Sequence, residues 1–248
     1  LRNRGLSKIP EDSVDSITMP GAIAALESLN EKFGTFGLDQ LTKPAIDYAI
    51  NGIVVSPRVA FDWNYSFKNL KGVAKGFYSD NGKPYSMGSI FKAPGQAAVL
   101  KKIARKGAKG FYDGEVADDF ITSLSKIGGV HSFDDLKAVS IEYVDPCKLK
   151  FRGHELFEMP PNGQGITAIL MTKMLEKLNI SNLDPKCSER IHLEAEVAKL
   201  AYHNRDSMIA DPKFFNLNYD HFFSEEVVNK LISKISTDRV LDQNNFQN

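Results

Sequence analysis

Apolar side chains recur every three or four positions along most of this chain, which is the spacing of amphipathic helices. The pattern predicts helices at about residues 19–33, 38–51, 57–70, 95–107, 116–127, 133–138, 166–178, 188–208 and 225–236. Residues 1–18 are polar and predict surface coil, and residues 71–94 are rich in Gly, Ser, Asn and Pro. We therefore expect an irregular excursion at 71–94, with at most a small hairpin.

Residues that favour helix ends stand near most of these predicted boundaries. Thr18 is placed to cap the first helix, and Ser56 precedes a proline at the start of the third. Ser132 and Asp135 have the three-residue spacing of a capping box. Ser188 is expected to cap the long helix that runs to about residue 208.

A different pattern occupies residues 147–165. Residues 147–151 and 154–159 alternate in polarity around Gly153, which predicts a β-hairpin with a tight turn. The double proline at 160–161 ends the second strand, because proline has no N–H to donate to a ladder. Asn162, Gly163 and Gly165 permit positive φ, so we expect a sharp, Gly-rich turn into the next helix.

Two interpretations of this turn remain open. It could be an anion or carboxylate cradle, because a helix N-terminus presents free backbone N–H groups. It could instead be a strand-to-helix connection that needs glycine for close packing. This second role is the commoner one for such a turn. It is neither a phosphate-binding Walker loop nor a dinucleotide-binding fingerprint.

Composition and charge exclude several classes of function. The chain has 248 residues, of which 42% are hydrophobic and 25% charged, and its formal net charge is zero. This balance gives no reason to expect nucleic acid as a partner. No apolar run approaches the ~18 residues that a membrane span needs, so we expect no membrane segment in this chain.

Candidate chemical groups are few. His192 and Glu196 lie four apart on a predicted helix, but neither they nor His203 fit a zinc-protease frame, and an exposed helix face explains them better. Arg205, Asp206 and Asp211 cluster at the end of the same helix. They could bind a substrate amine or a metal ion; the commoner role is an Arg–Asp ion pair that stabilises the helix end and the loop after it.

The two cysteines complete the search. Cys147 and Cys187 could pair, although single buried thiols are the simpler expectation, and no surrounding motif indicates a reactive thiolate. The residues alone therefore predict no catalytic, substrate-binding or metal-ligating residue and no cofactor. They indicate an α+β, mostly helical fold.

Six stretches in one order resemble the γ-glutamyltranspeptidase family of N-terminal-nucleophile hydrolases. They are residues 16–22 (SITMPGA), 31–35 (EKFGT), 44–56 (PAIDYAINGIVVS), 110–117 (GFYDGEVA), 151–165 (FRGHELFEMPPNGQG) and 195–212 (AEVAKLAYHNRDSMIADP). The resemblance covers about residues 4–240. Asn162 and Gly163 depart from the proline and serine that are usual in the family's turn.

The resemblance implies a precursor that cuts itself into a large and a small subunit. The new N-terminal threonine of the small subunit is the nucleophile, with its own α-amino group as general base. This chain is similar to the later part of the large subunit, so the nucleophile, the oxyanion-hole glycines and the amine-binding carboxylate lie downstream. The arginine that binds the substrate's α-carboxylate lies upstream of the region matching Leu1. No family catalytic residue can therefore be carried onto a position here.

The resemblance also implies a fold and partners. We expect residues 1–248 to be one incomplete domain of an αββα N-terminal-nucleophile hydrolase sandwich, with a helical lobe at about 19–140 and the hairpin and following helices at about 141–240. The expected partners are the downstream small subunit of the same precursor and a γ-glutamyl or other small amide substrate. The alternative is a non-catalytic scaffold or binding module related to this family. A stand-alone hydrolase using His203, Asp206 and Asp211 is a third, weaker hypothesis.

Overall fold

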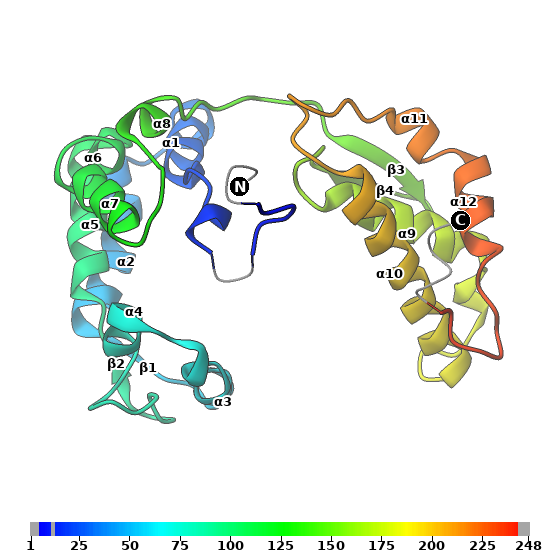
Figure 1. The fold of residues 1–248 in the computed structure, drawn as a ribbon, viewed down its shortest axis with the longest axis horizontal. Coiled ribbons are helices and arrows are strands. Elements are labelled where there is room, and N and C mark those ends of the chain that lie inside the picture. The colour runs from blue at the N-terminus through cyan, green and yellow to red at the C-terminus, as the bar shows by residue number, and fades with distance from the viewer. Residues whose placement is uncertain (1–4, 11–12, 243–248) are drawn as a thin grey trace. The chain divides into compact units, whose positions relative to one another are not determined.

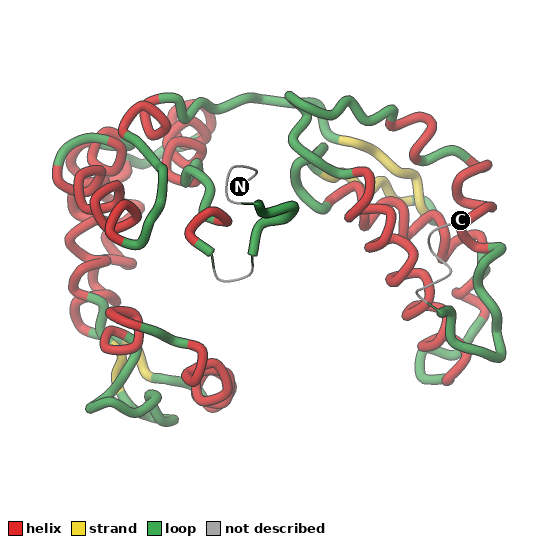
Figure 2. The backbone as a smooth tube through the Cα atoms, viewed as in Figure 1, coloured by secondary structure: helices red, strands yellow, loops and turns green. Residues whose placement is uncertain are grey.

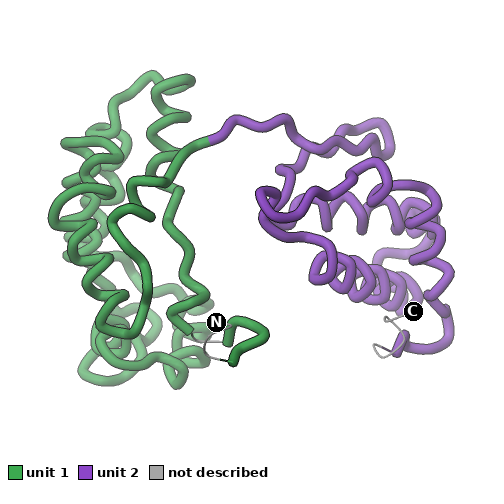
Figure 3. The backbone as a smooth tube through the Cα atoms, turned by 45° about the horizontal axis from the view of Figure 1, so that its top comes forward, with its two compact units in different colours: residues 1–141 green, residues 142–248 purple. Residues whose placement is uncertain are grey.

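The computed structural model describes residues 5–10 and 13–242 of the chain. Helices dominate this part, and its four short strands form two antiparallel pairs (Figure 2). The expected α+β, mostly helical fold is therefore confirmed at this level. The chain divides into two compact units, residues 1–141 and 142–248 (Figure 3). The assignment of one incomplete domain to the whole chain, and its place in a sandwich, stay predictions.

Unit 1 is built mainly from helices (Figure 1). Its elements are η2 (Val14–Ser16), α1 (Ala22–Phe33), α2 (Leu38–Asn51), β1 (Ile53–Val54), α3 (Pro57–Ser66), η3 (Phe67–Asn69), α4 (Gly72–Phe77), β2 (Ile90–Phe91), α5 (Pro94–Lys106), α6 (Lys109–Tyr112), α7 (Glu115–Lys126) and α8 (Phe133–Lys137). Helices α2 and α5 pack along each other. The short strands pair with Ile53 opposite Phe91. The polar start at residues 1–4 lies outside the described residues.

The first helix begins later than its sequence indicated, and Thr18 does not cap it. Helix α1 begins at Ala22, after Gly21. The hydroxyl of Tyr112 donates to Pro20 O at 2.6 Å and accepts the Ala24 N–H at 3.3 Å. A side chain from 88 residues further along the chain therefore satisfies this helix start, which no local pattern could indicate.

Other predicted helix ends are confirmed. The Ser56 hydroxyl accepts the Val59 N–H at the start of α3. The capping box of Ser132 and Asp135 is present at α8. Helix α2 has the predicted bounds and ends before Gly52, whose φ of 93° is readily available only to glycine.

The excursion at 71–94 contains a helix that the sequence pattern missed. Helix α4 carries two glycines, which oppose helix formation locally. An aromatic cluster holds this segment, because the rings of Trp63, Phe77, Tyr78 and Phe91 pack edge to face or stacked. The Trp63 indole also donates to Tyr78 O at 2.9 Å. Tertiary packing therefore overrides a weak local preference here.

Unit 2 packs a hairpin and four helices around one core. Its elements are β3 (Cys147–Phe151), β4 (His154–Glu158), α9 (Gly165–Lys177), η4 (Ile180–Asn182), α10 (Ser188–Met208), α11 (Tyr219–Phe222) and α12 (Glu225–Ile232). Helix α9 contacts both strands as well as α10 and α12 (Figure 1). The core is formed by buried side chains of these helices, among them Leu170, Met174, Leu200, Phe222 and Val228.

The predicted hairpin and its tight turn are confirmed. Leu149 pairs with Leu156, and Phe151 pairs with His154. Arg152 and Gly153 have φ values of 50° and 79°, as a two-residue hairpin turn requires.

Three details of unit 2 differ from expectation. The Sγ atom of Cys187, rather than Ser188, accepts the Arg190 N–H at the start of α10, because Ser188 is already the first helical residue. Both cysteines are free, and they are half-buried rather than buried. The sequence also predicts that the aromatic run Phe214, Phe215, Tyr219, Phe222 and Phe223 packs against the core. Phe222 does so, whereas Phe214 is 87% exposed.

Candidate functional site

The Gly-rich turn between β4 and α9 has the geometry of a close-packed connection. A Cβ atom on Gly165 would lie 2.6 Å from Glu158 Oε2 and 3.0 Å from Met159 O, so no larger residue fits without movement. Neither Gly163 nor Gly165 has a positive φ, although glycine permits one. Gly165 is therefore explained by the approach of β4, which supports the packing interpretation over an anion cradle.

Arg205 joins this turn to the end of α10. Its Nη1 donates to Gln164 Oε1 at 2.8 Å, and its Nε donates to Asp206 Oδ1 at 2.8 Å. Its guanidinium lies 4.6 Å from the centre of the Tyr202 ring. Arg205 thus contacts Gln164, Asp206 and Tyr202. The expected Arg–Asp ion pair at the helix end is confirmed.

Asp206 and Asp211 serve different local structures. Arg205 binds Asp206, while Asp211 Oδ1 accepts the N–H of Lys213 at 2.9 Å in the loop after the helix. Each carboxylate therefore stabilises its own segment, and the geometry gives no support to a shared amine or metal site.

His192 and His203 point to different surroundings on α10. His192 Nδ1 lies 3.9 Å from Glu196 Oε1, and its Nε2 lies 2.8 Å from Ser236 O. His203 instead lines a pocket further along the helix. Within residues 5–10 and 13–242, no three His, Cys, Asp or Glu side chains are grouped closely enough to hold a metal ion.

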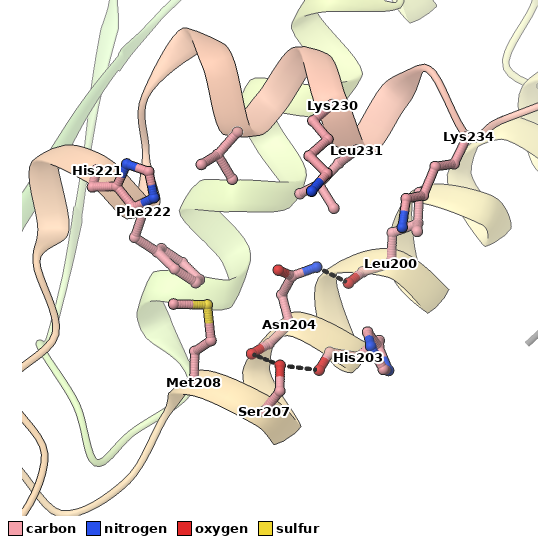
Figure 4. A pocket seen from close by; sticks show the side chains of 11 residues that line it. Leu200, His203, Asn204, Ser207, Met208, His221, Phe222, Lys230, Leu231 and Lys234 are labelled. Carbon is pink, nitrogen blue, oxygen red and sulfur yellow. Dashed lines mark hydrogen bonds between the residues drawn. The ribbon is translucent and has the colours of Figure 1, made fainter. Parts of the chain in front are cut away.

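That pocket, of about 230 Å³, lies between α10, α11 and α12 (Figure 4). Its floor is apolar, with Leu200, Phe222 and Leu231 buried. Its charged or titratable lining is basic and consists of His203, His221, Lys230 and Lys234; none of the described lining residues is acidic. The pocket could accept a small anionic group with an apolar body.

The pocket carries no activated nucleophile. The Ser207 hydroxyl lies 3.0 Å from His203 O and 3.1 Å from Asn204 O, so it is bound to the backbone of its own helix (Figure 4). The Cys147 thiol is no better placed, because burial raises its pKa and so disfavours the thiolate.

One buried charged residue was not predicted from the sequence. Glu196 is 1% exposed, although an exposed helix face was expected at this position. Its Oε1 accepts Lys199 Nζ at 2.6 Å, and its Oε2 accepts the Leu241 N–H at 3.0 Å. The spacing of His192, Glu196 and Lys199, at i, i+4 and i+7, was the available signal for one shared helix face.

None of the helices in the described part of the chain combines the length and apolar character needed to cross a membrane.

The family model for gamma-glutamyltranspeptidase matches residues 1–248. The chain belongs to this family of N-terminal-nucleophile hydrolases, as the six motifs implied.

Two bacterial proenzymes are among the curated relatives of the chain. It is 29% identical to the glutathione hydrolase-like YwrD proenzyme of Bacillus subtilis, over 94% of this chain and 45% of that protein. It is 27% identical to the capsule biosynthesis protein CapD proenzyme of Bacillus anthracis, over 87% of this chain and 40% of that protein. The chain thus spans less than half the length of these curated relatives.

A solved structure agrees with the fold. The Helicobacter pylori gamma-glutamyltranspeptidase crystal structure matches 95% of this chain and 68% of that chain, with a TM-score of 0.81 and 28% sequence identity. The sequence family and the fold therefore point to the same class of protein.

Proposed function

We propose that this chain is a large-subunit segment of an enzyme that cleaves or transfers γ-glutamyl, or related small, amides. The proposed nucleophile is the N-terminal threonine of a separate, downstream subunit of the same precursor. That threonine carries its own general base, the α-amino group, so the large subunit need not supply one. The family match over residues 1–248 carries this proposal, and the relatives named as proenzymes support it.

The described residues fit a supporting role better than a catalytic one. Ser207, Cys147 and the carboxylates Asp206 and Asp211 are each bound or buried in ways that oppose nucleophilic or acid–base work. This argues against the stand-alone hydrolase based on His203, Asp206 and Asp211.

The apolar surface of unit 1 suggests that further protein covers it. Apolar side chains at helical spacing on α1 are exposed, with Leu26 at 59% and Phe33 at 68%, and on α2 Tyr48 is 63% exposed. Exposed apolar faces of this kind usually mark an interface. We assign this face to contacts with the remainder of the precursor.

The total surface area supports the same conclusion. Folded proteins of 27.6 kDa expose about 11,000 Å², and two separate bodies of half that mass about 13,000 Å². The chain exposes 17158 Å². Even counted as two bodies, it leaves several thousand Å² that an ordinary folded protein would bury.

The hairpin of unit 2 offers strand edges for completion of a larger sheet. Among the described residues, β3 and β4 pair only with each other. A two-stranded sheet leaves an unpaired row of backbone groups on each strand, and such rows readily pair with further strands. We propose that strands of the remaining precursor pair here to form the αββα sandwich.

An activity assay tests the proposed function. The complete gene product that carries this chain should release the chromophore from a γ-glutamyl anilide, whereas residues 1–248 alone should not. Activity in residues 1–248 alone that is lost on Asp206→Asn would instead support the stand-alone hydrolase. An inactive complete protein would favour the non-catalytic scaffold.

A further inference from the structure

One face of α10 holds the backbone of the last described segment. We name residues 236–242 the C-terminal strap. His192 Nε2 lies 2.8 Å from Ser236 O, and the Glu196 carboxylate accepts the Leu241 N–H at 3.0 Å. Lys199 Nζ lies 3.5 Å from Leu241 O. The strap is therefore anchored at both ends by residues one and two helical turns apart.

The middle of the strap, residues 237–240, is separated from the first turns of α10 by a space of about 510 Å³. Val240 is 72% exposed, whereas the neighbouring Leu241 is half-buried and packs against the core of unit 2. The position of the strap is therefore set mainly at Ser236 and Leu241.

Glu196 makes the anchor at Leu241 specific. Its side chain is almost completely buried, and a buried carboxylate is costly unless its oxygens are paired. Lys199 satisfies one oxygen, and the Leu241 N–H satisfies the other. If the strap left this position, the second oxygen would lose its donor, so strap placement and carboxylate burial stabilise each other.

The contacts use main-chain atoms of the strap. Together with the packing of the Leu241 side chain, they set where residues 236–242 lie on unit 2. In a precursor whose scissile bond lies downstream, the position of Leu241 is the point from which the downstream peptide must reach the site that cuts it.

We propose that Glu196, supported by Lys199 and His192, is a positioning residue for self-cleavage of the precursor. This role rests on the proposed function, because it requires a downstream scissile bond. Glu196 takes no part in the bond-breaking step. It holds the strap, which reduces the freedom of the peptide that must reach the reacting geometry.

The test follows self-cleavage of the complete precursor by denaturing gel, after pulse production of the wild type and its variants. Glu196→Gln keeps an oxygen for the Leu241 N–H but places an amide against the Lys199 ammonium. We expect its cleavage to slow by about tenfold, or about 1.4 kcal/mol in activation free energy. The matched control is Glu194→Gln on the same helix, where the exposed carboxylate binds half-buried Arg190 and not the strap; it should cleave at the wild-type rate.

Two further readouts separate positioning from a general loss of structure. The double variant Glu196→Gln/Lys199→Met removes the unfavourable ammonium and should recover most of the lost rate. Once matured, each variant should have the wild-type kcat and KM, because the strap has then completed its role. His192→Ala, which releases the Ser236 anchor without exposing a buried charge, should slow cleavage even if Glu196→Gln does not fold.

The outcomes distinguish this inference from the proposed function. If the wild-type precursor cleaves, and Glu196→Gln and His192→Ala both cleave as fast as the wild type, the positioning role alone is overturned. Equal losses in cleavage rate and in matured kcat would also overturn it, since they indicate general damage. Wild-type precursor that never cleaves would overturn the proposed function and this role with it.

Discussion

Gly165 shows how one residue fixes the junction between strand and helix. Its position leaves no room for a Cβ atom beside Glu158 and Met159 O. We predict that Gly165→Ala destabilises unit 2 by about 1–3 kcal/mol, because backbone and strand must shift to admit the methyl group. Hydrogen exchange of α9 amides measures this change.

Gly163 provides the matched control for that substitution. It lies in the same turn, but nothing lies within 4 Å of the position of its Cβ atom. Gly163→Ala should leave the exchange of α9 nearly unchanged. Equal effects at the two glycines would contradict the packing explanation and reopen the anion-cradle interpretation.

Thr167 presents the opposite case, a buried polar atom without a partner. Its side chain is 3% exposed, and its Oγ1 makes no hydrogen bond to the described residues. Thr167→Val removes this unpaired hydroxyl at nearly constant shape and should stabilise unit 2 by roughly 1 kcal/mol. Thr172→Val on the same helix removes a hydroxyl that donates to Ala168 O and should not stabilise. Slower exchange of α9 amides in the first variant only is the expected result.

At the scale of single elements, the capping box of α8 gives a pH-dependent prediction. Hydrogen bonds from the Ser132 hydroxyl and backbone hold the pKa of Asp135 below its ordinary value of 3.8. A carboxyl whose pKa is lowered in the folded state stabilises that state above its unfolded pKa, and the stabilisation is lost as pH falls through the lowered pKa. The contribution of Asp135 is therefore complete at neutral pH and disappears in acid.

Ser132→Ala tests this assignment. Without the hydroxyl, the pKa of Asp135 should rise toward its ordinary value, and α8 should fray at its first turn. NMR titration of the Asp135 side chain in the two proteins measures the change. An unchanged pKa would mean that Ser132 is not its main hydrogen-bond donor.

Elements could be predicted from the sequence where local signals decide them. The bounds of α2, the cap of α3 and the turn at Arg152 and Gly153 follow from glycine, proline and serine chemistry. The start of α1 and the existence of α4 could not be predicted, because Tyr112 and the cluster around Trp63 act over long sequence distances.

The candidate site was predictable only in part. Spacing along α10 indicated that Arg205 and Asp206 would pair, and they do. The burial of Glu196 was not predictable, because it depends on the strap, which lies 45 residues further along the chain.

At the scale of the whole molecule, the sequence motifs identified the family, and unit 1 exposes several large apolar side chains, among them Leu26 and Phe33 of α1. The helical periodicity of α1 predicted a core face, yet that face is exposed here. Periodicity reports that a face is to be buried but not what buries it. We propose that contacts with the remainder of the precursor cover this face.

The most direct test of this account follows the complete gene product over time by intact mass and denaturing gel. We predict that one chain becomes two, that the first contains residues 1–248, and that the second begins with threonine. A product that stays uncut, or a second chain that begins with a residue that cannot act as a nucleophile, would contradict the proposal that the catalytic threonine lies downstream.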